Sequence, residues 1–351
     1  MVLAAVAAGL APVSSGTVER LFSTRIYPSI QRSLTPLTNA VPFAVFDLLT
    51  LGAAALLIVA LWRGIARARG ARSVRPLLPT LRHVAVAAAV VYLAFLGLWG
   101  FNYRRIPMTE RLVLDRAAPG ADAVVALGLD AVGRLNALHA EAHRVGWQAP
   151  PWDDRALRAA FEEVQRRLSD APPAVPGRLK SSVYGQYFRW TSVDGMVNPF
   201  ALEVLGNPDL LPFERPMVAA HEWAHLAGYA NEAEASFVGW LTCVRAGVAS
   251  QYSGWLNLYW EVGSELSAEN RTRLWEALAE GPRGDVEAMI ERVRRGQLPR
   301  LRAASWRVYD QYLRANRVEE GIRSYGEVIT LVLRARFEDG WTPVRRGAPS
   351  P

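Results

Sequence analysis

Two long apolar stretches in the first third of the chain limit what it can fold into. Residues 41–62 carry one ionisable side chain, Asp47, close to one end, and residues 84–101 carry none. A helix of about 20 apolar residues is long enough to cross the hydrocarbon core of a bilayer. Because helices of soluble proteins are usually amphipathic, we predict two transmembrane helices here rather than a pair of buried core helices. Asp47 is then expected at the level of the lipid headgroups rather than as a functional acid inside the membrane.

The segment between these stretches sets the predicted orientation. Residues 63–82 contain six arginines and no acidic residue, and Lys and Arg concentrate in the cytoplasmic loops of membrane proteins. We therefore place this loop in the cytoplasm and the chain after residue 101 on the opposite side. Residues 1–18 are predicted as a first transmembrane helix rather than a cleaved signal peptide, because the positive segment that begins a signal peptide is missing. Residues 1–105 thus form the predicted membrane domain.

The charge of the chain has to be located before it suggests a partner. The 351 residues include 40 Lys and Arg against 33 Asp and Glu, a net charge of +7. Residues 1–105 alone carry +9, whereas residues 106–351 carry −2. The basic surplus therefore belongs to the apolar N-terminal third, where it fixes orientation, and nucleic acid is not an expected partner.

Residues 106–343 have the composition of a mostly helical domain outside the membrane. Amphipathic stretches alternate with Pro- and Gly-rich breaks, and Asp153 or Asp154 is suited to cap the helix that follows one of these breaks. Residues 178–200 are richer in β-branched and aromatic residues, so they are the best candidate for a strand or hairpin. The predicted fold class is thus mainly α, with N-terminal transmembrane helices followed by a mostly helical α+β domain. Residues 344–351 are expected to form a disordered tail.

One motif of the chain carries chemistry. His221, Glu222 and His225 form the pattern HExxH. On a helix, residues four apart lie on the same face, so both imidazoles can bind one Zn²⁺. Glu222 lies beside the ligand face, where it can take a proton from a water at the metal and return it to a leaving amine. The sequence therefore predicts a zinc site in which Glu222 is the general base.

The third zinc ligand is expected shortly after this motif. Gly228 follows His225 by three residues, where a helix can end in a left-handed conformation and the chain can fold back. Glu232 is our first choice and Glu234 the reserve, because they are two residues apart and only one can face the metal. Two His and one Glu with an open position for water are the ligands of many catalytic zinc sites. The alternative is that both acids are solvated at a helix start, where the helix dipole favours them.

Two other groups of ligand-type residues are weaker candidates. His139 and His143 are also four residues apart, with Glu141 between them, but no downstream acid is an obvious partner. We therefore predict that they lie on the surface face of an amphipathic helix. Cys243 is the single cysteine, and its apolar neighbours indicate a core thiol rather than a ligand.

Two tyrosines and one upstream segment are further candidates for the site. Tyr252 and Tyr325 each offer a hydroxyl to an oxyanion, although buried packing is the expected role of either one. Residues 194–200 precede the HExxH motif. They form either a strand edge that binds the substrate backbone or a plain turn before a helix.

Two family resemblances rest on these motifs. HExxH followed by E-x-x-A and a small polar residue resembles the gluzincin metallopeptidases, particularly the membrane-integral ones with the third-ligand motif E-x-x-A-D. This resemblance implies a zincin-like domain in which Glu232 takes the ligand place and Ser236 stands where those enzymes have Asp. The chain as a whole resembles the bacterial family DUF3810. That resemblance lies in the N-terminal helices and in residues 100–105, 198–200, 220–237, 252–254 and 321–326.

Two functions are compatible with these features. The resemblance to gluzincins implies a membrane-anchored zinc metallopeptidase that hydrolyses a peptide or protein substrate, with the lipid bilayer as its other partner. It would be a multi-pass protein of the bacterial inner membrane with its catalytic domain on the exocytoplasmic side. The alternative is a non-catalytic, membrane-anchored structural or sensory protein with a structural zinc or no metal. A complete HExxH favours the first, since a structural site has no need of Glu222.

Overall fold

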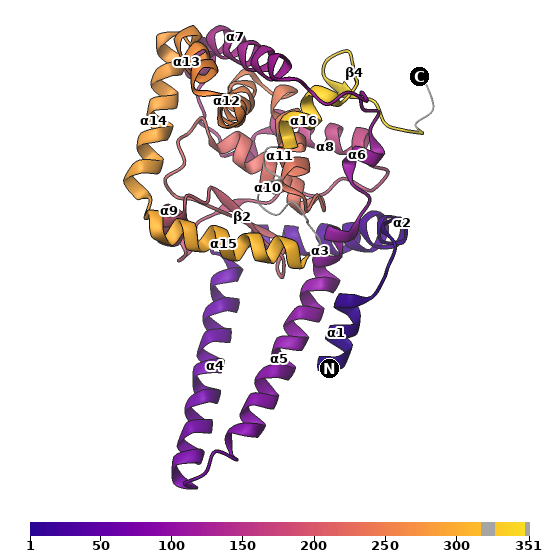
Figure 1. The fold of residues 1–351 in the computed structure, drawn as a ribbon, viewed down its shortest axis with the longest axis vertical. Coiled ribbons are helices and arrows are strands. Elements are labelled where there is room, and N and C mark those ends of the chain that lie inside the picture. The colour runs from indigo at the N-terminus through magenta and orange to yellow at the C-terminus, as the bar shows by residue number, and fades with distance from the viewer. Residues whose placement is uncertain (317–326, 348–351) are drawn as a thin grey trace.

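The computed structural model describes residues 1–316 and 327–347 of the chain. Two long helices, α4 (Val45–Gly70) and α5 (Leu77–Leu98), leave the rest of the molecule together as a pair (Figure 1). Both are long and apolar enough to cross a membrane. They extend beyond the apolar stretches, so the segment that connects them is 71–76 rather than the predicted loop 63–82. Arginines favour the last turns of a helix because they complement its dipole, and Arg67 and Arg69 lie in the last turn of α4.

The predicted transmembrane helix over residues 1–18 is wrong in its length. Helix α1 (Val2–Leu10) ends before Pro12, whose ring nitrogen cannot donate a helical hydrogen bond. A new helical run over Ser15–Ala40 follows at an angle of 105° to α1. The run consists of α2 (Ser15–Thr17), the π-helical η1 (Val18–Ile26) and α3 (Tyr27–Ala40). Among the residues that the structure describes, a third membrane crossing would arise only from this bent pair taken as one unit.

The hydrophobic core does not stop at the boundary predicted at residue 105. Val18, Tyr27 and Trp99 belong to the same buried cluster as Trp223 and the helices that follow it. We call the described chain outside α1, α4 and α5 the body of the protein. The N-terminal third therefore contributes both the two long helices and part of the packing of the body.

The body is built mainly of helices, as predicted. The Oδ1 atom of Asp154 accepts the backbone N–H of Ala156 and caps the helix that follows, as the sequence suggested. Helices α7 and α12 pack along each other, and α11 packs against α10. Besides α2, η1 and α3, the described helical elements of the body are η2 (Gly100–Arg104), α6 (Met108–Arg111), α7 (Ala121–Val145), η3 (Pro151–Asp153), α8 (Arg155–Leu168), α9 (Gly185–Thr191), α10 (Arg215–Leu226), α11 (Glu232–Val244), α12 (Val248–Glu265), α13 (Ala268–Ala277), α14 (Glu280–Gly296), α15 (Pro299–Ala315) and α16 (Glu327–Arg334).

The strand candidate over residues 178–200 is correct only at its two ends. Strands β1 (Leu179–Lys180) and β2 (Gly195–Asn198) flank β3 (Glu203–Gly206), with β1 parallel and β2 antiparallel to it. Most of the aromatic residues between β1 and β2 belong instead to α9, which buries Phe188 and Thr191, three residues apart on one helix face. A second, two-stranded sheet pairs β4 (Phe337–Glu338) with β5 (Thr342–Pro343).

The C-terminal tail predicted over residues 344–351 is ordered at its start. The backbone N–H of Val113 donates to the carbonyl of Val344, and Arg345 forms an ion pair with Asp170 at 2.9 Å. These contacts hold residues 344–345 against the segment after α6 and the loop after α8. Residues 348–351 lie outside the described residues.

A buried ion pair fastens the first long helix to the sheet. The carboxylate of Glu203 on β3 accepts the backbone N–H groups of Val45 and Phe46, which begin α4, at 3.1 and 2.7 Å. Lys180 on β1 neutralises this carboxylate at 2.8 Å. A carboxylate at a helix start satisfies free N–H groups and complements the helix dipole. The sheet therefore holds the N-terminal end of α4 in a fixed position.

Asp47 joins the same junction rather than standing alone in the long helix. Its carboxylate accepts the backbone N–H of Val183 at 2.9 Å and the hydroxyl of Ser182. Both partners belong to the loop after β1. Asp47 thus has a structural role where α4 meets the body.

Candidate metal centre

Helices α10 and α11 form the hairpin that carries the HExxH motif. Pro216 occupies the first turn of α10, where its missing N–H costs nothing. The predicted turn residue Gly228 has φ of +84°, a left-handed conformation that lets the chain fold back. The Oδ1 atom of Asn231 then accepts the N–H of Glu234 and caps α11. The local sequence thus brings the start of α11 against the second half of α10.

This hairpin brings His221, His225 and Glu232 together. The two Nε2 atoms are 3.1 Å apart, and they lie 3.2 and 3.3 Å from the Oε2 atom of Glu232. Two ligand atoms on one tetrahedral Zn²⁺ are about 3.4 Å apart, given metal–ligand distances of about 2.0–2.1 Å. The three atoms therefore match the spacing of a shared metal ion closely. The side chain of His221 is 17% exposed, so the position that a metal ion would take is open to solvent on one side.

Hydrogen bonds on the outer side of each ligand fix its orientation. The Nδ1 atom of His225 donates to the carbonyl of Tyr229 at 2.7 Å, and Nδ1 of His221 lies 3.2 Å from the hydroxyl of Ser236. The hydroxyl of Tyr309 on α15 donates to Oε1 of Glu232. In each case the other ligand atom is left facing the centre. Such outer partners set the tautomer and basicity of metal ligands.

Glu234, the reserve candidate, faces away from the two histidines. Its carboxylate accepts the backbone N–H of Met108 and lies 3.7 Å from the guanidinium of Arg111. Only Glu232 of the two acids is brought to the imidazoles. Both acids are buried, so neither is the solvated helix-start residue of the alternative prediction.

Glu222 is buried beside the centre with one oxygen unsatisfied. Its Oε2 atom has no hydrogen-bond partner among the described residues. Gly195 on β2 leaves space for this carboxylate, since a Cβ atom there would lie 2.5 Å from Oε1. Burial raises the pKa of Glu222 above its usual value, although the neighbouring His225 and His221 act in the opposite direction. A proton acceptor of raised pKa therefore lies next to the three ligand atoms.

The electrostatics of the metal-free centre are those of a buried ion pair. Burial opposes charge on His225, but the charge and hydrogen bond of Glu232 raise its pKa to about 9. Burial likewise opposes charge on Glu232, but the two imidazoles hold its pKa well below the usual range. A proton on the imidazole therefore takes the position of a cation. A metal ion would have to displace that proton, so its affinity would increase with pH.

The sequence offered no sign of two further residues near the centre. Tyr309 reaches Glu232 from α15, 77 residues further along the chain. Glu261 on α12 is close enough to interact electrostatically with His221, and burial raises its pKa to about 7. Neither residue belongs to a motif, and only the packing of α12 and α15 around the hairpin brings them to the site.

The centre lies next to the end of the second long helix. The indole N–H of Trp99, directly after α5, donates to the carbonyl of His225 at 3.0 Å. Tyr312 on α15 packs against Phe95 of α5 with ring centroids 6.3 Å apart. In Figure 1, α15 lies across the base of the body, where α4 and α5 leave it. The ligand hairpin is therefore at the end of the body that meets the long helices.

His139 and His143 are partly exposed on α7, at 24% and 38% of their side chains, but they have an acidic partner that the sequence did not reveal. Asp285 on α14 approaches both imidazoles, and the hydroxyl of Tyr252 donates to the same carboxylate. Tyr252 thus contacts a different group of residues from the HExxH centre. Cys243 is fully buried in the core, as expected. The remaining candidate, Tyr325, lies outside the described residues, as does the whole segment 321–326.

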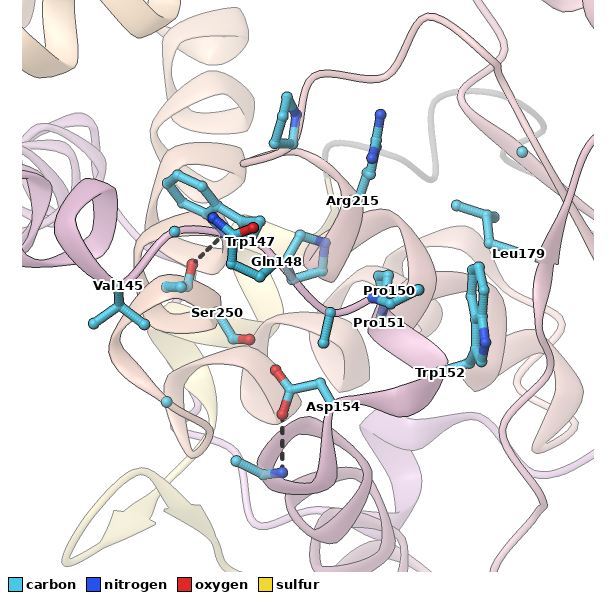
Figure 2. Close-up of a pocket in the computed structure, with 18 of the residues that line it drawn as sticks. Val145, Trp147, Gln148, Pro150, Pro151, Trp152, Asp154, Leu179, Arg215 and Ser250 are labelled. Atoms are coloured by element: carbon cyan, nitrogen blue, oxygen red, sulfur yellow. Dashed lines mark hydrogen bonds between the residues drawn. The ribbon is translucent and has the colours of Figure 1, made fainter.

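A separate cavity of about 560 Å³ lies at the start of α10. Figure 2 shows Trp147 and Trp152 on its walls, together with Pro150, Pro151 and Arg215. None of the predicted zinc ligands is among the described residues that line it. This cavity is therefore distinct from the metal centre.

Comparison with known proteins identifies a family to which the chain is similar. A family model described as "Protein of unknown function (DUF3810)" matches residues 22–333. Neither the curated proteins nor the solved structures include a significant match to the chain. The matched region covers α4, α5, the ligand hairpin and α15.

Proposed function

The chain belongs to the DUF3810 family, and from this premise we propose that it is a membrane-anchored zinc metallopeptidase with a zincin-like catalytic domain. His221, His225 and Glu232 are the zinc ligands, and Glu222 is the general base. The substrate is a peptide or protein, the class that the HExxH motif favours. The mutual spacing of the three ligand atoms supports the choice of a tetrahedral metal such as Zn²⁺.

The observation that carries this proposal is the unsatisfied carboxylate of Glu222. A buried carboxylate oxygen without a partner is costly to folding. A structural zinc site has no use for it, because three or four ligands already satisfy the metal. A hydrolase does need such a carboxylate, since the same oxygen can accept a proton from the attacking water. The placement of Glu222 therefore favours the catalytic function over the structural one.

Each residue of the centre has a defined task in hydrolysis. Bound Zn²⁺ supplies Lewis acidity, which polarises a carbonyl and lowers the pKa of water. Glu222 accepts the proton of the attacking water and transfers it to the leaving amine. Ser236 and Tyr229 hold the imidazoles, and Tyr309 holds the outer oxygen of Glu232, so that the ligand atoms need not reorganise.

Strand β2 is suited to hold an extended substrate. It is an edge strand of the sheet order β1-β3-β2, and its first residue, Gly195, lies against Glu222. An edge strand offers unpaired backbone groups that can bind a peptide by β-augmentation. We infer that the predicted segment 194–200 aligns the substrate backbone with the general base.

The metal centre faces the exocytoplasmic side in this proposal. Arginines are concentrated in the connecting segment 71–76 and in the last turns of α4 before it. This concentration favours a cytoplasmic location for the end of the helix pair that carries segment 71–76. The body lies at the opposite ends of α4 and α5 (Figure 1). In a bacterial inner membrane, the body and its metal centre would then be periplasmic or external.

The proposal is tested on the full chain purified in detergent micelles. Zinc content is measured by mass spectrometry, and cleavage of a peptide library is followed in parallel. We expect His221→Ala to lose the zinc of this site and all turnover. We expect Glu222→Gln to keep the zinc and to lose about 10²–10⁴-fold in turnover, the usual contribution of a general base.

Two outcomes would contradict the proposal. If the wild-type chain binds zinc but cleaves the library no faster than Glu222→Gln, the non-catalytic structural or sensory alternative is favoured. If His221→Ala binds as much zinc as the wild type, the metal centre itself is wrong. For the substrate, comparison of the proteomes of a deletion strain and a Glu222→Gln strain would identify the proteins that accumulate in both.

A further inference from the structure

A second group of metal-binding side chains lies away from the HExxH centre. His139 and His143 are on α7, four residues apart, and Asp285 is on α14. The Nε2 atoms of His143 and His139 lie 2.8 and 3.5 Å from the same oxygen, Oδ2 of Asp285. The three ligand atoms all lie within 4.8 Å of one another. As in the first centre, two imidazoles come from one helix and a carboxylate comes from another.

Neighbouring residues leave space for the ring of His139 and orient the carboxylate of Asp285. Gly281, one turn before Asp285 on α14, lies directly against the ring of His139, and any Cβ atom there would collide with the imidazole. The hydroxyl of Tyr252 on α12 donates to Oδ2 of Asp285 and orients the carboxylate. Hydrogen bonds of this kind from a neighbouring side chain position metal ligands.

Aromatic rings fix the second imidazole. His143 packs edge-on against Trp147, with ring centroids 5.1 Å apart, and against Tyr252 at 5.9 Å. Phe213 lies 6.2 Å from the same ring. The imidazole therefore has little freedom to turn away from Asp285, which reduces the entropy lost when it binds a ligand.

We propose that His139, His143 and Asp285 form a second divalent transition-metal site that takes Zn²⁺. Two imidazole nitrogens and one carboxylate oxygen are the borderline ligand set that zinc and its first-row neighbours prefer, whereas Ca²⁺ and Mg²⁺ prefer oxygen alone. The side chains of His139 and His143 are 24% and 38% exposed. Solvent can therefore deliver the ion and complete its coordination.

This site links two helices that are distant in sequence. Asp285 is 142 residues after His143, and a shared metal ion would fasten α14 to α7. Tyr252, which holds Asp285, is nine residues before Glu261 on α12, or about 13 Å along that helix. The role of the second site is thus to stabilise the helices around α12, and it does not depend on the proposed peptidase activity.

The test counts zinc ions on the full chain in micelles. After removal of all metal with a chelator, Zn²⁺ is titrated and binding is followed by calorimetry, with metal content checked by mass spectrometry. The proposal predicts two equivalents in the wild type, one in His221→Ala, one in the double variant His139→Ala/His143→Ala, and none in the triple variant. Glu141→Gln, on the exposed face of the same helix, is the matched control and should bind two.

A milder variant protects the test against misfolding. Asp285→Asn keeps the shape of the side chain but removes its charge, and we expect it to weaken the second equivalent at least tenfold while the first is unchanged. The proposal is overturned if the double variant, shown to be folded by circular dichroism, still binds two equivalents. It is also overturned if the wild type binds a single equivalent that His221→Ala abolishes, because the cluster is then only a hydrogen-bonded group.

Discussion

Two glutamates on the same turn of α11 have different surroundings, because their side chains point in different directions. Glu232 faces two imidazoles at 3.2 and 3.3 Å. Glu234 faces a backbone N–H and an arginine. Residues two apart on a helix point about 200° apart, so a single hairpin geometry cannot bring both to one metal ion. At the scale of single residues, this pair gives a controlled comparison.

We predict that Glu232→Gln weakens zinc binding at the HExxH centre by at least tenfold, because an amide is a poorer ligand than a carboxylate. Glu234→Gln is the matched control, being equally conservative and only two positions away. It should leave zinc affinity unchanged within a factor of two to three. Calorimetric titration of both variants measures the difference, and equal affinities would contradict the assignment of Glu232.

Glu261 provides a prediction about pH. Its pKa in the folded, metal-free chain is about 7, above the ordinary value of 4.5. Between those values the folded state holds a proton that the unfolded state releases, so stability falls as the pH rises from about 4.5 to 7. Glu261→Gln removes the ionisation and should stabilise the metal-free chain at pH 8 by roughly 1–3 kcal/mol.

Thermal unfolding at pH 4 and pH 8 measures this effect. The gain from Glu261→Gln should be present at pH 8 and absent at pH 4. Glu269→Gln, at an exposed position of α13, should change stability by less than about 0.5 kcal/mol at either pH. A gain of equal size at both pH values would contradict the raised pKa of Glu261.

Residues near one another in sequence were predictable, and distant ones were not. The spacing of His221 and His225 predicts a shared face, and Gly228 predicts the turn that brings Glu232 back. Tyr309 and Asp285 are 77 and 142 residues from their partners. No local pattern encodes such contacts, because they depend on how α14 and α15 pack. For the same reason, the sequence did not reveal Asp285 as the acidic partner of His139 and His143.

At the scale of helices and strands, the length of an uninterrupted apolar run predicted the structure reliably. The uninterrupted apolar runs predicted α4 and α5, since a long helix without a polar face is typical of a lipid-facing segment. Aromatic content misled over residues 178–200, because aromatic residues favour strands but are also common in short buried helices such as α9. The segment predicted as the first transmembrane helix is divided because α1 ends before Pro12, which cannot donate a helical hydrogen bond.

The approach of β2 to α10 gives a prediction at this scale. Gly195→Ala would place a Cβ atom 2.5 Å from Oε1 of Glu222, so the carboxylate must move. We expect a loss of about 10²-fold in turnover, typical of a displacement of about 1 Å. Zinc content should be unchanged, since Glu222 is not a ligand.

Gly263→Ala on α12 is the control for this substitution, because no heavy atom lies within 4 Å of its added Cβ. Peptide-library cleavage and zinc content are measured for both variants. If Gly195→Ala keeps wild-type turnover, the strand does not position the general base.

At the scale of the whole molecule, the predicted orientation follows from the two ends of the helix pair. The body lies at one end of α4 and α5, and the segment 71–76 lies at the other (Figure 1). We predict that a reporter enzyme active only outside the cytoplasm is active when fused after residue 110. The same reporter inserted at residue 73 should be inactive. The reverse pattern would show that the arginines do not set the topology.

We propose that one zinc ion is bound by two imidazoles of α10 and the carboxylate of Glu232 on α11. X-ray absorption at the zinc edge tests it most directly, on the full chain carrying His139→Ala and His143→Ala and loaded with one equivalent. We expect two imidazole ligands and oxygen neighbours at about 2.0–2.2 Å, without sulfur. A spectrum with one imidazole or none, or one that His221→Ala leaves unchanged, would contradict it.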